Sequence, residues 1–333
     1  METEEQINNV EEFLTLPFSD TSPLTEGPGE EDVGFTINEY FAHSIIGYGS
    51  SSTVWLATKS PNNAEYAIKE FRKSFLRRQK RANLLHTVSK QSGRTHLDRI
   101  SLEKKLHQDE QLDPFCYIRT ELDILQLLNH PNIVKIVEVI NNEYMDMLLV
   151  VLNYCSSGKL ASVDHGITFS AFPEESCRIY FRQLVSSVDY IHRKNVVHRD
   201  IKPDNILLDA ARNLCLIDFG LAEFLPPDGM VDVVSSTPAF MAPELLACPH
   251  QKVDGRKPDL WSMGVTLYVL AFAKLPFSGN TIAEMITNIK EKDLEIPNYA
   301  SENLRNVIKK LLQKEPQRRI NAQELLKDPF VRE

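Results

Sequence analysis

Two polar motifs on either side of a predicted hairpin limit the folds open to this chain. The first is His198-Arg199-Asp200-Ile201-Lys202-Pro203-Asp204-Asn205, and the second is Asp218-Phe219-Gly220. Between them, residues 206–208 and 214–217 have the composition of two short strands joined by a turn. Such a hairpin would bring Asp218 back beside Asn205, so that the carboxylate and the amide oxygen could hold Mg²⁺ together.

A glycine-containing turn occurs much earlier, in Gly47-Tyr48-Gly49-Ser50-Ser51-Ser52-Thr53-Val54, within a predicted hairpin over residues 41–59. Glycines have no Cβ, so the backbone there could approach phosphate groups closely. A tight turn without a ligand is the plain alternative. The loop is not a Walker loop, because no Gly-Lys-Ser/Thr follows, and its place between two strands argues against a dinucleotide-binding fold.

A predicted third strand over residues 65–71 contains Tyr66-Ala67-Ile68-Lys69. Side chains alternate between the two faces of a strand, so Ala67 and Lys69 point the same way. This arrangement would suit a cleft in which the alanine covers an adenine ring and the ammonium group holds phosphates. The alternative is an exposed lysine on an edge strand.

A further motif, Ala242-Pro243-Glu244, is followed by Asp259-Leu260-Trp261-Ser262-Met263-Gly264 and later by Arg319. We predict a buried ion pair between Glu244 and Arg319 that anchors a substrate-binding segment. The role of this pair would be structural, since removing one partner of a buried pair costs about 3–5 kcal/mol.

The composition is that of a globular protein with two parts. The chain has 333 residues, of which 42% are hydrophobic and 25% charged, and this length is typical of about two domains. Strand signals dominate before Gly158 and helix signals after it, which suggests two lobes. No apolar run reaches the ~20 residues of a membrane helix, and the N-terminal sequence does not resemble a signal peptide. The scattered cysteines support neither disulfides nor a zinc site, so we expect a protein of the cytoplasm or the nucleus.

Charge is unevenly distributed along the chain. The net charge is −9, yet residues 1–40 hold eleven acidic side chains and no Lys or Arg, whereas residues 72–105 hold eleven Lys and Arg against two acids. We interpret residues 1–37 as an acidic, disordered tail and residues 72–113 as a basic insertion. Regulatory contact between the two is one hypothesis, and two independent solvated segments are the alternative. An acidic chain without a nucleic-acid motif is not expected to bind nucleic acid.

The ordered set of motifs resembles the eukaryotic protein kinases over roughly residues 38–332. The resemblance implies a bilobal α+β fold. Its strand-rich N-lobe, residues 38–152, would contain the helix that the family calls αC; a hinge over 153–158 and a helical C-lobe over 159–332 would follow. The resemblance also implies ATP and Mg²⁺ as cofactors and proteins as substrates, with no membrane span.

The same resemblance implies a role for each matching position. Lys69 would contact the α- and β-phosphates of ATP and pair with Glu121, which lies in a predicted helix over residues 118–128. Asp200 would be the catalytic base or orient the substrate hydroxyl, and Lys202 would neutralise the transferring phosphoryl group. Asn205 and Asp218 would ligate Mg²⁺. The nucleotide-binding positions would be Ile46, Gly47, Tyr48, Gly49, Ser50, Ser51, Ser52, Thr53, Val54, Ala67, Lys69, Leu152, Asn153, Cys155 and Leu207.

Finer features resemble one group of kinases. Lys202 is typical of serine/threonine kinases, whereas tyrosine kinases have a different stretch there. Residues 236–244, and the separation of 52 positions from Lys69 to Glu121, resemble the calcium/calmodulin-dependent protein kinase kinases. That family phosphorylates activation-loop threonines of other kinases, including the AMP-activated class. No basic amphipathic segment follows residue 326, so calmodulin control is not implied here unless residues 72–105 supply it.

Two alternatives to this interpretation remain open. The chain could be a general calmodulin-dependent or AMP-activated-type kinase with other substrates. It could also be a pseudokinase scaffold, although Lys69, Asp200 and Asp218 are all present, which disfavours that class.

Many basophilic kinases carry a glutamate just after the hinge glycine, whereas here Lys159 follows Gly158. We therefore predict poor selection for arginine three residues before the target, unless Lys159 points to solvent.

Overall fold

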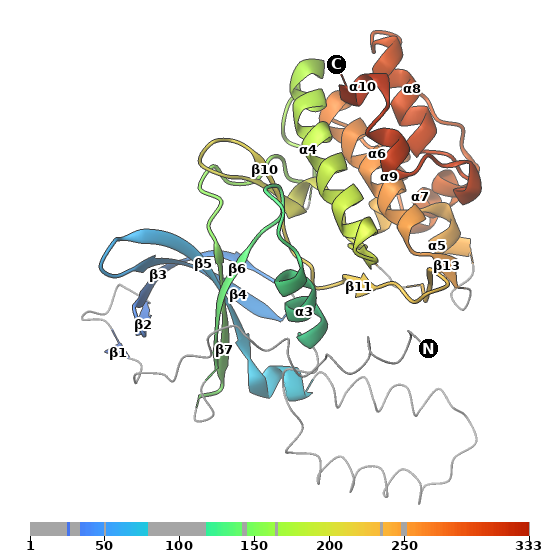
Figure 1. Ribbon diagram of the computed structural model, residues 1–333. Helices are drawn as coiled ribbons and strands as arrows, with labels where there is room; N and C mark the ends of the chain where they lie inside the picture. Colours follow the sequence, from blue (N-terminus) through green and yellow to red (C-terminus); the bar gives the residue numbers. More distant parts are fainter. Residues whose placement is uncertain are drawn as a thin grey trace, which may run out of the picture. The chain divides into compact units, whose positions relative to one another are not determined.

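The structure, a computed structural model, describes the chain in several stretches and divides it into two compact units. The described residues are 25–26, 34–49, 51–78, 118–141, 145–163, 166–233, 236–247 and 252–332. The first unit comprises Met1–Asp123 and Lys135–Tyr154, and the second comprises Ile124–Val134 and Cys155–Glu333. The first is rich in strands and the second in helices, so the predicted α+β fold is confirmed (Figure 1).

The first unit is built on a seven-stranded antiparallel sheet in the order β1-β2-β3-β4-β5-β7-β6. Its strands are β1 Thr25–Glu26, β2 Phe35–Ile37, β3 Tyr40–Tyr48, β4 Ser52–Lys59, β5 Ala64–Arg72, β6 Ile136–Asn141 and β7 Met147–Asn153. Neighbouring strands from β2 to β5 follow one another in the sequence, as expected where short turns connect antiparallel strands. The predicted hairpin and third strand therefore correspond to β3, β4 and β5.

Alternating side chains on these strands form the core of the first unit. Trp55, Ala57 and Ile68 are buried together with residues from β2, β3, β6 and β7, because every second side chain on a strand faces the same side. The Trp55 indole keeps its polar group satisfied by donating a hydrogen bond from Nε1 to Glu70 Oε2 at 2.7 Å. The ring of Phe35 packs edge-on against Trp55 with 5.3 Å between centroids.

The beginning of the sheet differs from the sequence-based expectation. Thr25–Glu26 and Phe35–Ile37 lie in the part of the chain that the sequence predicts to be a disordered tail. They nevertheless form β1 and β2, which pair with each other, and β2 pairs with β3. Phe35 and Ile37 provide only two apolar positions, too few to reveal a strand period in the sequence. Ile37 is nevertheless 2% exposed, so burial against the rest of the sheet stabilises a strand that is too short to form alone.

Helix α3, Arg119–Leu127, contains Glu121 in its first turn and ends before His130 and Pro131, as the sequence pattern predicts. Residues 73–78 are also helical. The rest of the basic insertion, and all of residues 1–24 and 27–33, lie outside the described residues. The hypothesis of contact between tail and insertion therefore stays a prediction.

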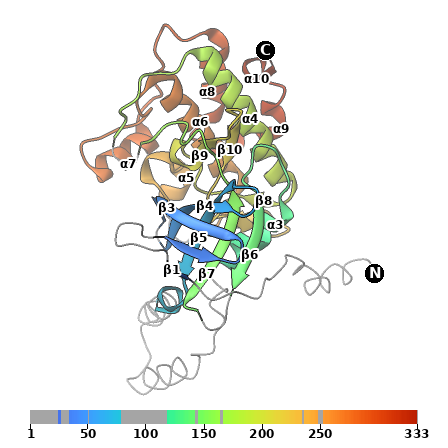
Figure 2. The same cartoon turned by 90° about the vertical axis from the view of Figure 1, so that its left-hand side faces the viewer.

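Helices dominate the second unit. They are α4 Glu174–Arg193, α5 Pro243–Ala247, α6 Arg256–Phe272, α7 Ile282–Glu291, α8 Glu302–Leu311, α9 Ala322–Leu325 and α10 Pro329–Arg332. Three short antiparallel pairs join β8 Val196–Val197 to β11 Glu223–Phe224, β9 Ile206–Leu208 to β10 Leu214–Leu216, and β12 Met230–Val231 to β13 Val253–Asp254. Helix α6 packs against both α4 and α8 (Figure 2).

Helix α6 lies at the centre of this unit and is buried on all sides from Pro258 to Phe272, as expected of a helix that is apolar all round. Close packing against α8 depends on Gly264. A Cβ placed on Gly264 would lie 2.7 Å from Leu311 Cβ and 2.9 Å from Leu312 Cδ2. Within the described part of the chain, no helix is long and apolar enough to cross a membrane.

Replacing Gly264 with valine should lower the free energy of unfolding by about 1–3 kcal/mol, because the added methyl groups overpack the contact with α8. Urea unfolding followed by circular dichroism measures the change. Ala283 is an exposed residue of α7, and its change to valine is the control, with an expected cost of only about 0.5 kcal/mol from helix propensity. Equal effects of the two substitutions would contradict the assigned role of Gly264.

Candidate active site

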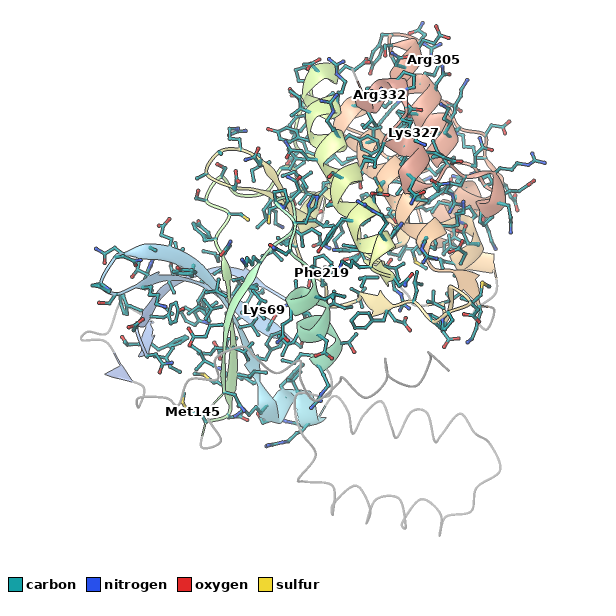
Figure 3. The ribbon with its side chains drawn as sticks, in the orientation of Figure 1. Lys69, Met145, Phe219, Arg305, Lys327 and Arg332 are labelled. Carbon is teal, nitrogen blue, oxygen red and sulfur yellow. The ribbon has the colours of Figure 1, made fainter. Side chains whose placement is uncertain are left out.

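Lys69 and Glu121 form a buried ion pair within the first unit. Lys69 lies on β5, opposite Val54 of β4 on one side and Val150 of β7 on the other (Figure 3). Its Nζ donates a hydrogen bond to Glu121 Oε1 at 2.7 Å, and the two side chains are 14% and 9% exposed. The predicted pairing is therefore confirmed, and the alternative of an exposed edge-strand lysine is wrong because β5 is an interior strand.

The glycine-containing turn connects β3 and β4. Gly47 pairs with Val54 and Tyr48 with Thr53, and Gly49 N donates to Ser52 O at 2.8 Å. A Cβ on Gly49 would lie 2.6 Å from Ser52 Oγ, so a larger residue there would require the serine side chain to rotate away. Tyr48 is 79% exposed at the end of β3. Ser50 lies outside the described residues.

The other predicted nucleotide-binding positions fall into two groups. In the first unit, Ala67 of β5 pairs with Leu152 of β7, which Asn153 follows at the end of that strand. In the second unit, Leu207 of β9 pairs with Cys215 of β10 and forms an isolated bridge with Lys159. Cys155 is 5% exposed. Ala67, Leu152, Asn153 and Leu207 are thus held by strand pairing, whereas Cys155 lies outside the strands. The role of these residues in binding a nucleotide stays a prediction.

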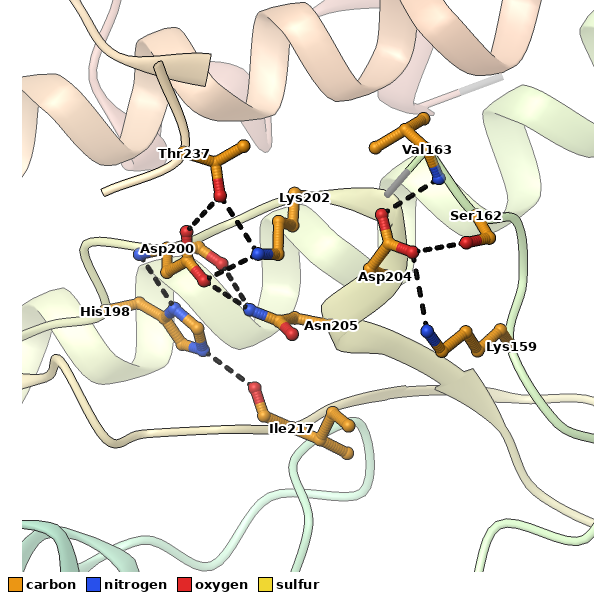
Figure 4. A network of polar contacts seen from close by, with 10 residues as sticks. All are labelled: Lys159, Ser162, Val163, His198, Asp200, Lys202, Asp204, Asn205, Ile217 and Thr237. Carbon is orange, nitrogen blue, oxygen red and sulfur yellow. Dashed lines mark hydrogen bonds and ion pairs between the residues drawn. The ribbon is translucent and has the colours of Figure 1, made fainter. Parts of the chain in front are cut away.

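Polar side chains gather around Asp200 in the second unit (Figure 4). Asn205 Nδ2 donates to the backbone oxygen of Asp200 at 2.8 Å and to its Oδ2 at 2.9 Å. Lys202 Nζ lies 3.1 Å from Asp200 Oδ2 and donates to Thr237 Oγ1 at 2.9 Å. Thr237 Oγ1 in turn donates to Asp200 Oδ1 at 3.2 Å. The sequence does not reveal these contacts of Thr237, because its partners are 35 and 37 positions away in the chain.

The predicted hairpin brings the two polar motifs together. Strands β9 and β10 pair antiparallel, and Ile217 N donates to Asn205 O at 3.0 Å. His198 Nε2 donates to Ile217 O at 3.0 Å, which joins the first motif to the residue just before Asp218. The ring of Phe219 packs edge-on against His198 with 4.7 Å between centroids. The predicted hairpin is therefore confirmed.

The buried carboxylate of Asp259, on α6, holds the backbone of the two residues that precede Asp200 in the sequence. Asp259 accepts hydrogen bonds from His198 N at 3.0 Å, from Arg199 N at 2.8 Å and from His192 Nε2 at 2.9 Å. Burial acts to raise the pKa of Asp259, but these partners outweigh it and lower the pKa below its usual value. The motif that begins with Asp259 does not reveal this function in the sequence, since the partners of Asp259 lie 60 or more positions away.

Two oxygen-bearing side chains have the chemistry of a magnesium site. The amide nitrogen of Asn205 is engaged by Asp200, so its oxygen is the atom left to face a cation. Asp218 follows the strand that pairs with β9, at a left-handed φ of 61°. Mg²⁺ prefers oxygen ligands, and it is usually held by one or two protein groups together with substrate phosphates. The residues present therefore fit Mg²⁺. Among the described residues, no group of three or more His, Cys, Asp or Glu side chains forms a separate metal site.

The segment after Asp218 is anchored by a second buried ion pair. Arg319 Nη1 and Nη2 donate to the two carboxylate oxygens of Glu244 at 2.7 and 3.0 Å. The Arg319 side chain is fully buried and also donates to the backbone oxygens of Lys257 and Gln313. This bidentate contact confirms the predicted Glu244–Arg319 ion pair.

Lys159 lies beside an acidic residue of the first polar motif. Its Nζ is 3.4 Å from Asp204 Oδ1, and the side chains are 49% and 3% exposed. Asp204 also accepts hydrogen bonds from Ser162 Oγ at 2.5 Å and from Val163 N at 3.0 Å. Lys159 thus pairs with Asp204 and still leaves half of its side chain in contact with solvent.

Comparison with known proteins agrees with this geometry. The protein kinase domain model matches residues 87–331, which is more than half of the chain. That match includes Glu121, Asp200, Asn205 and Asp218, and it begins after Lys69.

Three curated kinases are similar to the chain to different extents. The serine/threonine-protein kinase ppk34 of Schizosaccharomyces pombe is 53% identical over 317 residues, covering 95% of this chain and 90% of that protein. CBL-interacting serine/threonine-protein kinase 14 of Arabidopsis thaliana is 37% identical, over 65% of this chain and 48% of its own length. A probable serine/threonine-protein kinase, MARK-A of Dictyostelium discoideum, is 33% identical, over 68% of this chain and 21% of its own length. The chain therefore belongs to the protein kinase family and is a protein-serine/threonine kinase.

Proposed function

We propose that this kinase transfers the γ-phosphoryl group of ATP to activation-loop threonines of other protein kinases. The observation that carries the phosphotransfer chemistry is the network of Asp200, Lys202, Asn205 and Thr237. ATP supplies the phosphoryl group, and Mg²⁺ held by Asn205 and Asp218 would offset the phosphate charge. In the first unit, the contacts to the phosphates come from Lys69, with Glu121 holding its ammonium group.

Asp200 is the residue that takes the proton of the substrate hydroxyl or orients that hydroxyl. Lys202 and Asn205 bind its Oδ2 and Thr237 binds its Oδ1, so the carboxylate is fixed in direction before a substrate arrives. Fixed orientation matters because phosphoryl transfer depends on positioning and charge stabilisation more than on covalent chemistry. Lys202 adds a positive charge beside the carboxylate, where it can offset charge on the transferring group.

Two features support a role in phosphorylating other kinases. Residues 236–244 resemble the calcium/calmodulin-dependent protein kinase kinases, and so does the long separation between Lys69 and Glu121. An assay with a recombinant AMP-activated-type kinase, made inactive by its own substitution, tests this role directly. We expect phosphate on the activation-loop threonine of that substrate, located by mass spectrometry, and none with the Asp200→Asn enzyme. Efficient phosphorylation of generic peptides with no phosphate on the loop threonine would favour the alternative, a general calmodulin-dependent or AMP-activated-type kinase.

Lys159 predicts a specific substrate preference. The half-exposed ammonium group of Lys159, beside the loop that contains Asp200, repels a substrate arginine. Asp204 does not offset this repulsion, because its carboxylate is already held by Ser162, Val163 and Lys159 itself. A positional peptide library should therefore show no enrichment of arginine three residues before the target. Lys159→Glu should create such a preference, whereas Lys252→Glu, at an exposed residue elsewhere in the second unit, should leave the profile unchanged. Strong arginine selection by the unaltered kinase would contradict the prediction.

A further inference from the structure

Two cysteine thiols meet in the second unit. Cys155 and Cys215 both carry free thiols, and the two residues are only 5% and 7% exposed. Each thiol has the other as its hydrogen-bond partner. Cys177, the third cysteine in the described part of the chain, is fully buried on α4 and donates instead to Phe172 O at 3.8 Å. Cys155 and Cys215 therefore form a thiol pair, whereas the thiol of Cys177 is bound to the backbone.

Strand β9 holds the backbone near both cysteines. Along one edge of β9, Cys215 of β10 lies directly opposite Leu207, so these two side chains are on the same face. Along the other edge, Leu208 N donates to Gly158 O at 2.9 Å. Gly158 N in turn donates to Cys155 O at 3.2 Å, which closes the turn that begins at Cys155. The thiol pair is thus supported by backbone hydrogen bonds on both edges of β9.

The two cysteines differ in how firmly their backbone is held. Next to Cys215 in β10, Leu216 N donates to Asn132 O at 2.8 Å and Leu216 O accepts from Val134 N at 3.0 Å. Strand β10 is therefore hydrogen-bonded on both of its edges, whereas Cys155 belongs to a turn. If the two sulfur atoms were drawn together, the turn at Cys155 would move more than the strand.

The two thiols also differ in acidity. The hydrogen bond from Cys215 lowers the pKa of Cys155, against burial and the charge of Asp209, which act to raise it. The same hydrogen bond, together with burial, raises the pKa of Cys215. Burial raises the pKa of Cys177 to about 12. Since the thiolate is the nucleophilic form of cysteine, Cys155 is the member of the pair that attacks an electrophile.

We propose that Cys155 and Cys215 are a modification site at which hydrogen peroxide, a small oxidant, forms a disulfide. Cys155 attacks the O–O bond of the peroxide, which gives a sulfenic acid on Cys155 and one molecule of water. The Cys215 sulfur then attacks the sulfenic sulfur, so that the S–S bond forms, the S–O bond breaks and a second water leaves. The two thiols together lose two electrons and two protons, and the peroxide is reduced to water.

This disulfide is a reversible modification and not part of the folded framework. A dithiol reductant restores both thiols by thiol–disulfide exchange. In reducing compartments, the disulfides that do form are mostly transient and serve catalysis or redox sensing. The pair was not evident from the sequence, because the contact joins two segments that are far apart in the chain.

Formation of the disulfide weakens ATP binding. An S–S bond is about 2.05 Å long, shorter than any noncovalent contact between two sulfur atoms. Because β10 is held on both edges, the turn at Cys155 moves towards Cys215. Cys155 is a predicted nucleotide-binding position, and misplacing a substrate-positioning group by about 1 Å can cost up to 10²-fold. The effect on ATP rests on the proposed function, whereas formation of the disulfide does not.

The first test treats the full chain with excess hydrogen peroxide and analyses an unreduced proteolytic digest by mass spectrometry. We expect two peptides joined through Cys155 and Cys215, lighter by two hydrogen atoms than the separate peptides, and separated again by dithiothreitol. Cys177 should remain a thiol. The proposal would be overturned if both cysteines of the pair stayed thiols. It would also be overturned if Cys155 became a sulfinic or sulfonic acid without joining Cys215.

The second test measures the kinetics of the linked enzyme. We expect the KM for ATP to rise about tenfold, with kcat at saturating ATP within about twofold, and dithiothreitol to restore the KM. A fully linked enzyme with an unchanged KM would overturn the effect on ATP. Phosphorylation of generic peptides alone would sink the proposed action on other kinases, yet both the link and the KM could still be measured with such a peptide.

Substitutions show whether the shift in KM comes from this pair. Cys215→Ala should have the KM of the unaltered kinase before treatment and keep it in peroxide. Cys177→Ala is the matched control, since Cys177 is a buried cysteine of the same unit, and peroxide should still raise its KM. An equal rise in Cys215→Ala would overturn the proposal. The Tm of each variant shows whether it is folded; should Cys215→Ala fail to fold, the digest of the unaltered chain decides whether the link forms.

Discussion

Replacing Asp200 with asparagine should lower kcat by about 10²–10⁴-fold while the protein keeps its fold. Asparagine has nearly the same shape, and its amide oxygen can still accept hydrogen bonds from Asn205 or Lys202. What is lost is the negative charge and the capacity to take a proton from the substrate hydroxyl. The expected signature is a large fall in kcat with little change in Tm.

Steady-state phosphorylation of a protein substrate, together with thermal unfolding, measures both quantities for Asp200→Asn. The matched control is Asp293→Asn, because Asp293 is exposed on the same unit, and it should leave both unchanged. If the Asp200→Asn enzyme kept more than about a tenth of the rate, the role assigned to Asp200 would be wrong.

Replacing Lys69 with methionine should abolish phosphotransfer and also destabilise the first unit. The lysine is the partner of a Glu121 side chain that is only 9% exposed. Removing one member of a buried ion pair typically costs about 3–5 kcal/mol, because the remaining charge is left without compensation. Loss of activity alone would therefore not separate a catalytic role from a structural one.

A double substitution makes that separation for Lys69. Changing both members of a buried pair to apolar side chains of similar size is often neutral for stability. Lys69→Met/Glu121→Leu should therefore regain most of the Tm and still show no phosphotransfer. Lys135→Met, at an exposed residue of the same unit, should change neither quantity. Recovery of activity along with stability would show that Lys69 serves the fold and not the reaction.

Features carried by local sequence were predictable. The β9–β10 hairpin lies between two motifs that are close in the chain, and the Lys69–Glu121 pair follows from strand alternation and the family resemblance. Thr237 and Asp259 could not be found in this way, because their contacts with the loop of Asp200 join distant segments. The β1 and β2 strands were missed for another reason: their burial comes from the sheet that they join, and their own sequence has too few apolar positions.

The burial of Asp259 limits how easily the loop that contains Asp200 can open. The amide protons of His198 and Arg199 point at a carboxylate on α6, a helix enclosed by its neighbours. These protons can reach water only when the loop separates from α6, so their hydrogen exchange reports the free energy of that opening. The loop carries irregular backbone, yet its first two residues should exchange with deuterium as slowly as amides in the interior of the helical unit.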